Sequence, residues 1–156
     1  MSIQLKNPIH FLAFGFGSGL IQPAPGTWGS LAGLFVAIFC WNLTACQPFF
    51  ITLTVIGFIA GCFICEKASR DLGVHDDGRI VWDEIVAIFF IFSFLPEYHW
   101  LYYALTFIIF RFFDIVKPYP IRYFDERLQG GFGIMFDDIL AAIYSVLTLY
   151  LIYWCF

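Results

Sequence analysis

Five apolar stretches, separated by polar segments, dominate this chain of 156 residues. They run over Leu31–Cys46, Phe49–Cys65, Ile85–Leu95, Leu101–Phe110 and Ile139–Phe156. Two of the connections are short, at residues 47–48 and 96–99, and two are long and charged, at residues 66–84 and 111–138. Apolar stretches of this kind predict helices that enter a membrane. We therefore expect an all-α fold in one membrane-embedded domain covering residues 1–156.

The third and fourth apolar stretches are each too short to cross a bilayer, which takes about 20 helical residues. Residues 85–110 form either one helix kinked at Pro96 or a helical hairpin that turns at residues 96–99. The hairpin puts all eight Lys and Arg residues on one side of the membrane, whereas the single helix divides them four and four. Lys and Arg concentrate in cytoplasmic loops. We therefore predict a multi-pass bundle of about five apolar helices, with two charged cytoplasmic segments, the N-terminus inside and the C-terminus outside.

The hairpin also predicts where several charges lie. If its helices extend to about Arg79 and Lys117, then Asp83, Glu84, Arg111 and Asp114 lie near the depth of the lipid headgroups. Ionisable residues at that depth are costly and are candidates for function.

Composition supports the membrane assignment. Hydrophobic residues make up 61% of the chain, aromatic residues 22% and charged residues only 13%, whereas soluble domains carry roughly 25% charged residues. The formal net charge is −4, and no basic run is present, so nucleic acid is not expected as a partner. The five cysteines lie in or beside apolar stretches, and the Cys62-x-x-Cys65 pair has no second Cys or His pair beside it. We interpret them as ordinary thiols without a disulfide framework.

A local repeat supplies two acidic pairs. Residues 80–87 and 134–141 share the pattern Ile, apolar, aromatic, acid, acid, Ile, apolar, Ala, which puts Asp83–Glu84 and Asp137–Asp138 in equivalent positions. Each pair is expected at the start of an apolar helix. Helix capping is the simpler explanation and accounts for one acid per helix. Because four clustered carboxylates repel one another, the pattern favours a site for a hard divalent cation such as Mg2+.

Residues 111–125 combine cations with further acids. Arg111, Asp114 and Lys117 are spaced by three and share one helical face, and Pro118 is expected to end the helix. An ion-pair ladder is one explanation of this spacing. The other is a phosphate site, because Arg offers a planar fork and Lys a mobile charge to phosphate oxygens. In that case Arg122 is a third cation, and Asp125 is expected to orient it.

Two more polar segments are candidates for the same site. Residues 15–30 are rich in glycine and precede the first apolar stretch, so their backbone N–H groups, with Gly26, Thr27 and Ser30, are candidates for holding an anion. Close packing at a membrane surface is the alternative. Residues 72–78 read as a turn, but they also place His75 and Asp76 near the Asp83 helix. Asp76 is the better candidate of the two, because it adds to a carboxylate cluster.

Four blocks of the chain resemble the bacterial phosphatidylglycerophosphatase A family. They are residues 15–31 with a Pro-Gly-Thr-x-Gly-Ser core, residues 73–84 with His-Asp and Ile-Val-Trp-Asp-Glu, residues 111–125 reading R-x-x-D-x-x-K-P-x-P-I-R-x-x-D, and residues 130–138 reading G-G-x-G-I-M-x-D-D. The resemblance implies an all-helical, Mg2+-dependent enzyme of the bacterial inner membrane. It also implies conversion of phosphatidylglycerophosphate to phosphatidylglycerol and inorganic phosphate.

The resulting hypothesis is a lipid phosphatase whose active site faces the cytoplasm. One or two Mg2+ ions are expected on the acidic pairs and on the further candidates Asp76 and Asp114. Phosphate is expected on Arg111, Lys117 and Arg122, together with Gly26, Thr27 and Ser30. The catalytic candidates are Asp76, Arg111, Asp114, Lys117 and Arg122.

Several choices stay open at this point. Attack by water and a phospho-aspartate intermediate are both compatible with these residues, and the number of metal ions and the oligomeric state are open. The rivals are another enzyme of phospholipid headgroups and a divalent-cation transporter. The first lacks its usual D-G-x-x-A-R signature here, and the second lacks a charged path through the apolar stretches.

Overall fold

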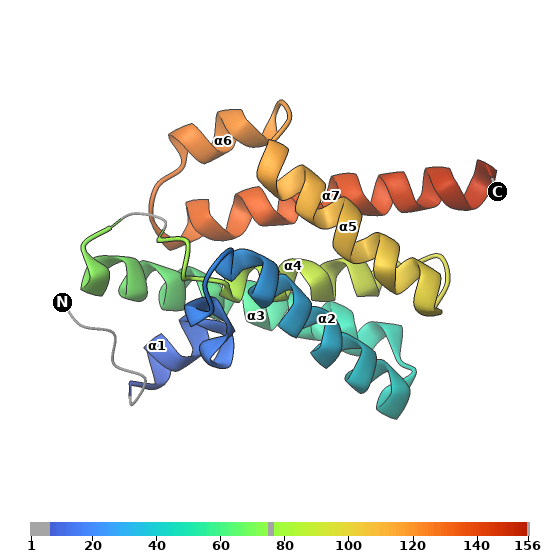
Figure 1. Cartoon of the computed structure of the whole chain (residues 1–156), viewed down its shortest axis with the longest axis horizontal. Coiled ribbons are helices and arrows are strands. Elements are labelled where there is room, and N and C mark those ends of the chain that lie inside the picture. Colours follow the sequence, from blue (N-terminus) through green and yellow to red (C-terminus); the bar gives the residue numbers. More distant parts are fainter. Residues whose placement is uncertain (1–6, 75–76, 156) are drawn as a thin grey trace.

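The computed structural model describes residues 7–74 and 77–155, and within these ranges the chain is helical with no β-strand. The elements, in chain order, are α1 (Pro8–Ala13), the 3-10 helix η1 (Gly15–Leu20), α2 (Pro25–Thr44), α3 (Gln47–Leu72), α4 (Trp82–Ser93), α5 (Trp100–Val116), α6 (Ile121–Arg127) and α7 (Gly130–Cys155). The long helices lie side by side along the length of the molecule, and α1 and α6 lie at one end (Figure 1). The predicted all-α fold is confirmed.

Three helices, α2, α3 and α7, are long and apolar enough to cross a membrane. Most of each apolar stretch is unburied within the bundle. Large apolar side chains such as Phe35, Phe63 and Leu151 point outward instead. Such a surface suits lipid rather than water. The sequence predicted about five spans, but α4 has 12 residues and α5 has 17, so these two do not reach that length.

Helix α4 is the centre of the bundle. It packs against α2, α3 and α7, and nine of its 12 residues are buried, including Ile88 and Phe92. Because its neighbours enclose it on several sides, α4 does not need the length of a helix that faces lipid. Its first turn carries Asp83 and Glu84 into the bundle.

The chain reverses between α4 and α5, as the hairpin prediction required. Tyr98 closes the turn, because its hydroxyl donates to the carbonyl oxygen of Phe92 (2.8 Å) and its ring stacks on Trp41 at 3.4 Å between centroids. Gln47 at the start of α3 donates to the carbonyl oxygen of Ser93 (2.7 Å). The alternative of one helix kinked at Pro96 is therefore wrong.

The helix boundaries differ from the predicted ones at several places. The first helix of the hairpin begins at Trp82, not near Arg79, whereas α5 ends at Val116 and the left-handed Lys117 precedes Pro118, as expected. Helix α3 continues beyond Cys65 to Leu72, where Gly73 ends it in the left-handed conformation. Its last turns carry the (i, i+4) ion pairs Glu66–Arg70 and Lys67–Asp71, which favour continued helix.

The glycine-rich segment before the first apolar stretch is more ordered than the expected loop. Residues 15–20 form η1, and α2 begins at Pro25, so Gly26, Thr27 and Ser30 lie in its first turns. The backbone N–H of Val81 donates to the carbonyl oxygen of Ala13 (2.9 Å), which ties this region to the start of α4.

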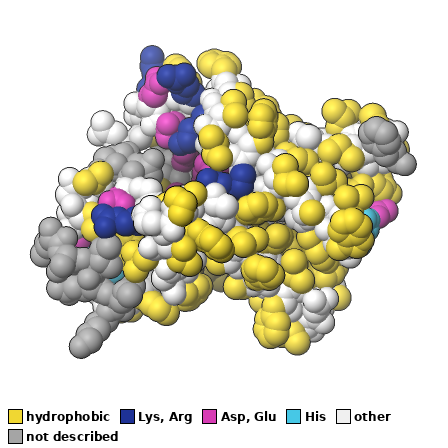
Figure 2. Space-filling model, in the orientation of Figure 1, with side chains coloured by type: hydrophobic (Ala, Val, Ile, Leu, Met, Phe, Trp, Pro, Cys, Tyr) yellow, Lys and Arg dark blue, Asp and Glu magenta, His cyan; other side chains and the backbone are white. Residues whose placement is uncertain are grey.

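Lys and Arg side chains gather toward the end of the bundle that carries α1 and α6, and the opposite end is mostly apolar (Figure 2). At that opposite end, the turn between α4 and α5 carries an ion pair between Glu97 and His99. The one-sided charge distribution predicted from the sequence is thus present among the described residues.

Candidate active site

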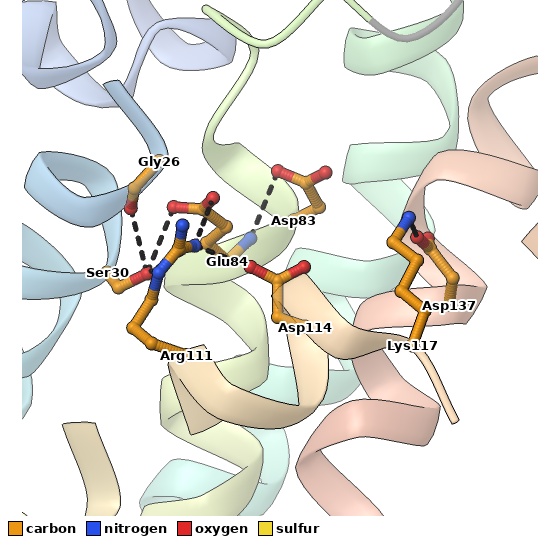
Figure 3. Close-up of polar contacts among 8 residues, drawn as sticks. All are labelled: Gly26, Ser30, Asp83, Glu84, Arg111, Asp114, Lys117 and Asp137. Carbon is orange, nitrogen blue, oxygen red and sulfur yellow. Dashed lines mark hydrogen bonds and ion pairs between the residues drawn. The ribbon is translucent and has the colours of Figure 1, made fainter. Parts of the chain in front are cut away.

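One half of the site is built around Arg111, near the end of α5. Its Nη1 donates to Glu84 Oε1 (2.9 Å), to Asp114 Oδ2 (2.5 Å) and, at 3.4 Å, to the hydroxyl of Ser30. Ser30 in turn donates either to Glu84 Oε2 (3.1 Å) or to the carbonyl oxygen of Gly26 (2.9 Å). We call Ser30, Glu84, Arg111 and Asp114 the Arg111 cluster; it joins α2, α4 and α5 (Figure 3).

Glycines on α2 make room for the buried carboxylate in this cluster. A Cβ atom at Gly29 would lie 2.7 Å from Glu84 Oε2, and one at Gly26 would collide with Glu84 Oε1. Any larger residue at either position would push α2 away from α4. The Pro-Gly-Thr-x-Gly-Ser block therefore allows α2 to approach Glu84, and its last residue, Ser30, donates to the same carboxylate.

The other half of the site is built around Lys117. The left-handed backbone of Lys117 ends α5 and directs the ammonium group toward α7 and α6, where Nζ contacts Asp137 Oδ2 (2.5 Å) and Asp125 Oδ1 (2.8 Å). Burial alone lowers the pKa of Lys117, but the two carboxylates outweigh burial, and the pKa lies above the usual lysine value. Lys117 is therefore charged at neutral pH. We call Lys117, Asp125 and Asp137 the Lys117 cluster.

The second acidic pair does not lie at a helix start, and this part of the sequence prediction was wrong. Helix α7 begins at Gly130, so Asp137 and Asp138 lie about two turns inside it. Free N–H groups are confined to the first turn of a helix, so capping does not explain this pair. Asp138 is 3% exposed, and its Oδ2 has no hydrogen-bond partner among the described residues.

The carboxylates of both halves lie close enough to interact. The negative charges of Asp83, Glu84, Asp114 and Asp137 all act on Asp138. In Figure 3, Asp114 is the member of the Arg111 cluster that lies on the side of the contact between Lys117 and Asp137. Two cations, Arg111 and Lys117, stand among six acids once Asp125 is included. The site therefore holds an excess of acidic groups over cations in a largely buried setting.

This donor set fits Mg2+ in its chemistry. Hard divalent ions take carboxylate oxygens, and the buried Oδ2 of Asp138 is an acceptor that a cation would satisfy. Among the described residues, no three acidic, His or Cys side chains already stand in a metal-binding arrangement. Arg111 and Lys117 instead occupy the oxygens of Glu84, Asp114 and Asp137.

Other residues predicted for the site belong to neither cluster. Arg122 is exposed on α6 and pairs with Glu126 (3.0 Å); Asp125 contacts Lys117 and not Arg122, so the expected Asp125–Arg122 pairing was wrong. The side chain of Thr27 is partly buried and makes no hydrogen bond in the described part of the chain. His75 and Asp76 lie outside the described residues.

One contributing residue escaped the sequence interpretation. Glu66 on α3 accepts a hydrogen bond from the backbone N–H of Gly131 (2.6 Å) at the start of α7. It thereby stabilises the helix end that precedes Asp137 and Asp138. Its only visible signal was its place at the edge of an apolar stretch, because its partner is 65 residues away in the sequence. None of the five cysteines, all of which lie within the described residues, takes part in a disulfide.

The fold and the site together define an all-helical protein with a charged, carboxylate-rich centre at one end of an apolar bundle. The family model for phosphatidylglycerophosphatase A matches residues 11–153. The chain belongs to the phosphatidylglycerophosphatase A family.

Known relatives agree with this assignment. The chain is 54% identical to a phosphatidylglycerophosphatase A of Haemophilus influenzae, over 97% of this chain and 93% of the relative. It is 43% identical to a phosphatidylglycerophosphatase A of Escherichia coli K12, over 96% and 86% of the two chains. It is also 36% identical to a putative phosphatidylinositol-3-phosphatase of Bacteroides thetaiotaomicron, over 90% of each chain. No solved structure matches the chain.

Proposed function

We propose that this enzyme hydrolyses the phosphomonoester of phosphatidylglycerophosphate and releases phosphatidylglycerol and inorganic phosphate. Water adds its oxygen to phosphorus, the bond from phosphorus to the glycerol oxygen breaks, and that oxygen leaves with a proton. The family match and the two near-full-length relatives support this reaction. The observation that carries it on the structural side is the meeting of buried acids with Arg111 and Lys117 at one end of the bundle.

Arg111 and Lys117 are proposed to hold the phosphoryl group. Both cations are fixed by carboxylates, and Arg111 Nε is a buried donor without a partner among the described residues, so a phosphate oxygen can satisfy it. Preorganised donors stabilise the charge that spreads over phosphoryl oxygens in the transition state. Ser30 and the first turn of α2, with Gly26 and Thr27, are proposed to complete the anion site.

Mg2+ is proposed to bind the carboxylates of Asp83, Glu84, Asp137 and Asp138, with Asp114 and Asp76 as further ligand candidates. When bound, it supplies Lewis-acid polarisation of the phosphoryl oxygens. The excess of acids over cations and the unpartnered Oδ2 of Asp138 support this proposal. Asp76 and Asp114 also stay candidates for a catalytic carboxylate, and Arg122 stays a candidate for attracting the anionic headgroup.

The membrane arrangement follows from the charge distribution. We propose an inner-membrane protein with the α1–α6 end in the cytoplasm, because the described Lys and Arg residues gather there. Helices α2, α3 and α7 cross the bilayer, and the α4–α5 hairpin enters between them, which gives five helices with the C-terminus outside. The diacylglycerol part then stays in the bilayer while the phosphate reaches the site.

The test is phosphate release from phosphatidylglycerophosphate in detergent micelles, with Mg2+ and with excess chelator. Three proteins are compared: the wild type, Asp137→Asn, and the control Glu97→Gln, which changes an acid in the turn at the apolar end of the bundle. We expect metal-dependent release by the wild type and the control, and none above background by folded Asp137→Asn. Release that survives chelation and the Asp137 change would refute the carboxylate–metal mechanism.

The same assay addresses headgroup choice. The Bacteroides thetaiotaomicron relative bears the name of a putative phosphatidylinositol-3-phosphatase, so phosphatidylinositol 3-phosphate is the second candidate substrate. We expect a lower kcat/KM for it than for phosphatidylglycerophosphate, because the other two relatives are more similar to this chain. The reverse order would reassign the substrate without changing the site.

A further inference from the structure

Asp125 is the one carboxylate of the Lys117 cluster that is not a candidate metal ligand. Lys117 Nζ lies 2.8 Å from Asp125 Oδ1 on α6 and 2.5 Å from Asp137 Oδ2 on α7. The two carboxylates differ in depth, because the side chain of Asp125 is 32% exposed and that of Asp137 only 7%. Lys117 is therefore held by an inner acid that is proposed to bind Mg2+ and by an outer acid that has no role in the mechanism so far.

Packing fixes the position of Asp125 relative to the inner acid. The residue before each of the two acids is aromatic, and the rings of Phe124 and Phe136 meet edge to face at 5.4 Å between centroids. The connection that precedes α6 is also tied to α7, because the hydroxyl of Tyr144 donates to the carbonyl oxygen of Tyr119 (3.2 Å). Asp125 is thus held beside α7, although α6 has only seven residues.

The Arg111 cluster has no corresponding outer acid. Arg111 contacts Glu84 and Asp114, and both of these carboxylates are candidate metal ligands. Arginine presents a rigid planar fork, whereas the ammonium group of lysine is a compact charge on a flexible stem and can turn from one acceptor to another. A cation bound at Asp137 would compete with Lys117 for that carboxylate. Because it has a second acid, Lys117 can give up Asp137 without leaving the site.

The ammonium group of Lys117 also has a donor left for substrate. It carries three N–H groups, and the two carboxylates are its partners in the described part of the chain. At least one N–H is therefore available for a phosphate oxygen. A partly exposed ion pair contributes little to stability, so a purely structural role would make Asp125 nearly dispensable.

We propose that Asp125 is a positioning residue for Lys117. When a cation is bound at Asp137, the contact between Lys117 and Asp125 keeps the ammonium group beside the site, where it donates to a phosphate oxygen of the substrate. This inference rests on the proposed function and assigns a role to Asp125 within it. Asp125 acts through Lys117 and touches neither the cation nor the phosphate.

A double-mutant cycle in the full-length protein in detergent tests this role. The proteins compared are the wild type, Asp125→Asn, Lys117→Met and the double variant with both changes. Asp125→Glu is added because it keeps the carboxylate. Glu126→Gln is the matched control, because it removes the same charge from the next position of α6, on a side chain that pairs with Arg122 and not with Lys117. Thermal melting identifies the variants that are folded.

Phosphate release from phosphatidylglycerophosphate is the first readout. We expect Asp125→Asn to lower kcat/KM by about tenfold, as for outer partners that orient a residue of a site, and Asp125→Glu to restore most of it. In the Lys117→Met background, Asp125→Asn should change kcat/KM by less than about twofold, because no ammonium group is left to position. A loss of equal size in both backgrounds, or no loss from Asp125→Asn alone, would overturn the proposal.

Cation binding without substrate is a readout that does not depend on turnover. Mn2+ prefers the same carboxylate ligands as Mg2+, and its binding is followed by electron paramagnetic resonance. Without Asp125, Lys117 keeps only Asp137 as a partner and competes more strongly with the cation. We expect Asp125→Asn to raise the Kd for Mn2+ by about tenfold and Glu126→Gln to change it by less than about twofold.

The effect of Asp125→Asn on the Kd should vanish in the Lys117→Met background. A rise of equal size with and without Lys117 would show that the charge of Asp125 acts on the cation directly, and this would overturn the proposal. Failure of the proposed function shows separately, as absence of phosphate release by a wild-type protein that binds Mn2+.

Discussion

The two acidic pairs share a sequence pattern but stand in different places. Asp83 and Glu84 lie in the first turn of α4, where free backbone N–H groups and the helix dipole stabilise carboxylates. Asp137 and Asp138 lie well inside α7, where neither is available. Local helix chemistry therefore accounts for the first pair and leaves the second without an explanation of that kind.

The partners of the two pairs differ as well. Glu84 is held by Arg111 and Ser30 in a setting where its side chain is 10% exposed. Asp137 is held by Lys117, while Asp138 has a buried oxygen with no partner among the described residues. A buried carboxylate that gains nothing from its own helix destabilises the fold unless a cation compensates it. The difference supports the proposal that the second pair binds a ligand, whereas the position of the first pair is also explained by its own helix.

The largest effects are expected in the second pair, at Asp138 as at Asp137. Asp138→Asn replaces a buried carboxyl group that is a proposed cation ligand by an amide, so we expect phosphate release to fall on the order of 10³-fold, as for groups that stabilise transition-state charge. The melting temperature in chelator should stay the same or rise, because an amide has no charged form to be buried among other acids. Phosphate release and thermal melting in detergent measure the two effects.

The matched variant is Asp83→Asn in the first pair. Asparagine still accepts hydrogen bonds near a helix start, so a smaller loss of activity and no rise in melting temperature are expected. Equal losses of activity, with equal shifts in melting temperature, would remove the distinction between the pairs.

The next largest effect is a loss of stability when the cation that holds each acidic pair is removed. Arg111→Met leaves Glu84 and Asp114 buried without their partner, so we expect a loss of about 3–5 kcal/mol in the free energy of unfolding. Lys117→Met should cost less, because Lys117 is more exposed than Arg111 and only one of its two carboxylate partners, Asp137, is as buried as Glu84. Thermal melting of both variants in detergent shows which of them loses more stability. The wild type is the reference, and Arg122→Met is the control. A larger loss for Lys117 would contradict the comparison.

The sequence predicted the features that depend on local chemistry. Pro118 ends α5 where expected, and the one-sided charges correctly favoured the hairpin over a kinked helix. Features that depend on distant contacts were not predicted. The early start of α7 involves Glu66, which lies 65 residues before Gly131, and this is why the second acidic pair was wrongly expected at a helix start.

The site was predictable as a set of residues but not as an arrangement. Arg111, Asp114, Glu84 and Ser30 meet, and Lys117 joins Asp137, as members of one predicted site. Their division into two clusters depends on the left-handed turn at Lys117 and on the path of α6, which no spacing reveals. Arg122 shares the same block of sequence but points to solvent, because α6 is short and lies on the outside of the bundle.

A smaller loss of stability is expected from a substitution where α2 approaches the first acidic pair. Gly29→Ala adds a methyl group against Glu84 and Val81, so we expect a loss of about 1–3 kcal/mol from overpacking. Gly78→Ala is the control, because nothing lies within 4 Å of its Cβ position. Melting temperatures in detergent measure both. If Gly29→Ala were as stable as Gly78→Ala, close contact between α2 and Glu84 would not be needed to hold the first pair.

The smallest effect is expected at Arg122, the predicted phosphate ligand that belongs to neither cluster. Its guanidinium is exposed and pairs only with Glu126 among the described residues, so it can attract an anionic headgroup at a distance but does not hold it in this conformation. We expect Arg122→Ala to lower kcat/KM by about two- to fivefold at low salt, with the difference fading as salt screens the charge. Arg127→Ala is the control, because its guanidinium lies over the ring of Tyr123 at 4.2 Å on the same helix. A loss at Arg122 that persists in high salt and matches the loss at Lys117 would show that α6 moves to bring this arginine into the Lys117 cluster when substrate binds.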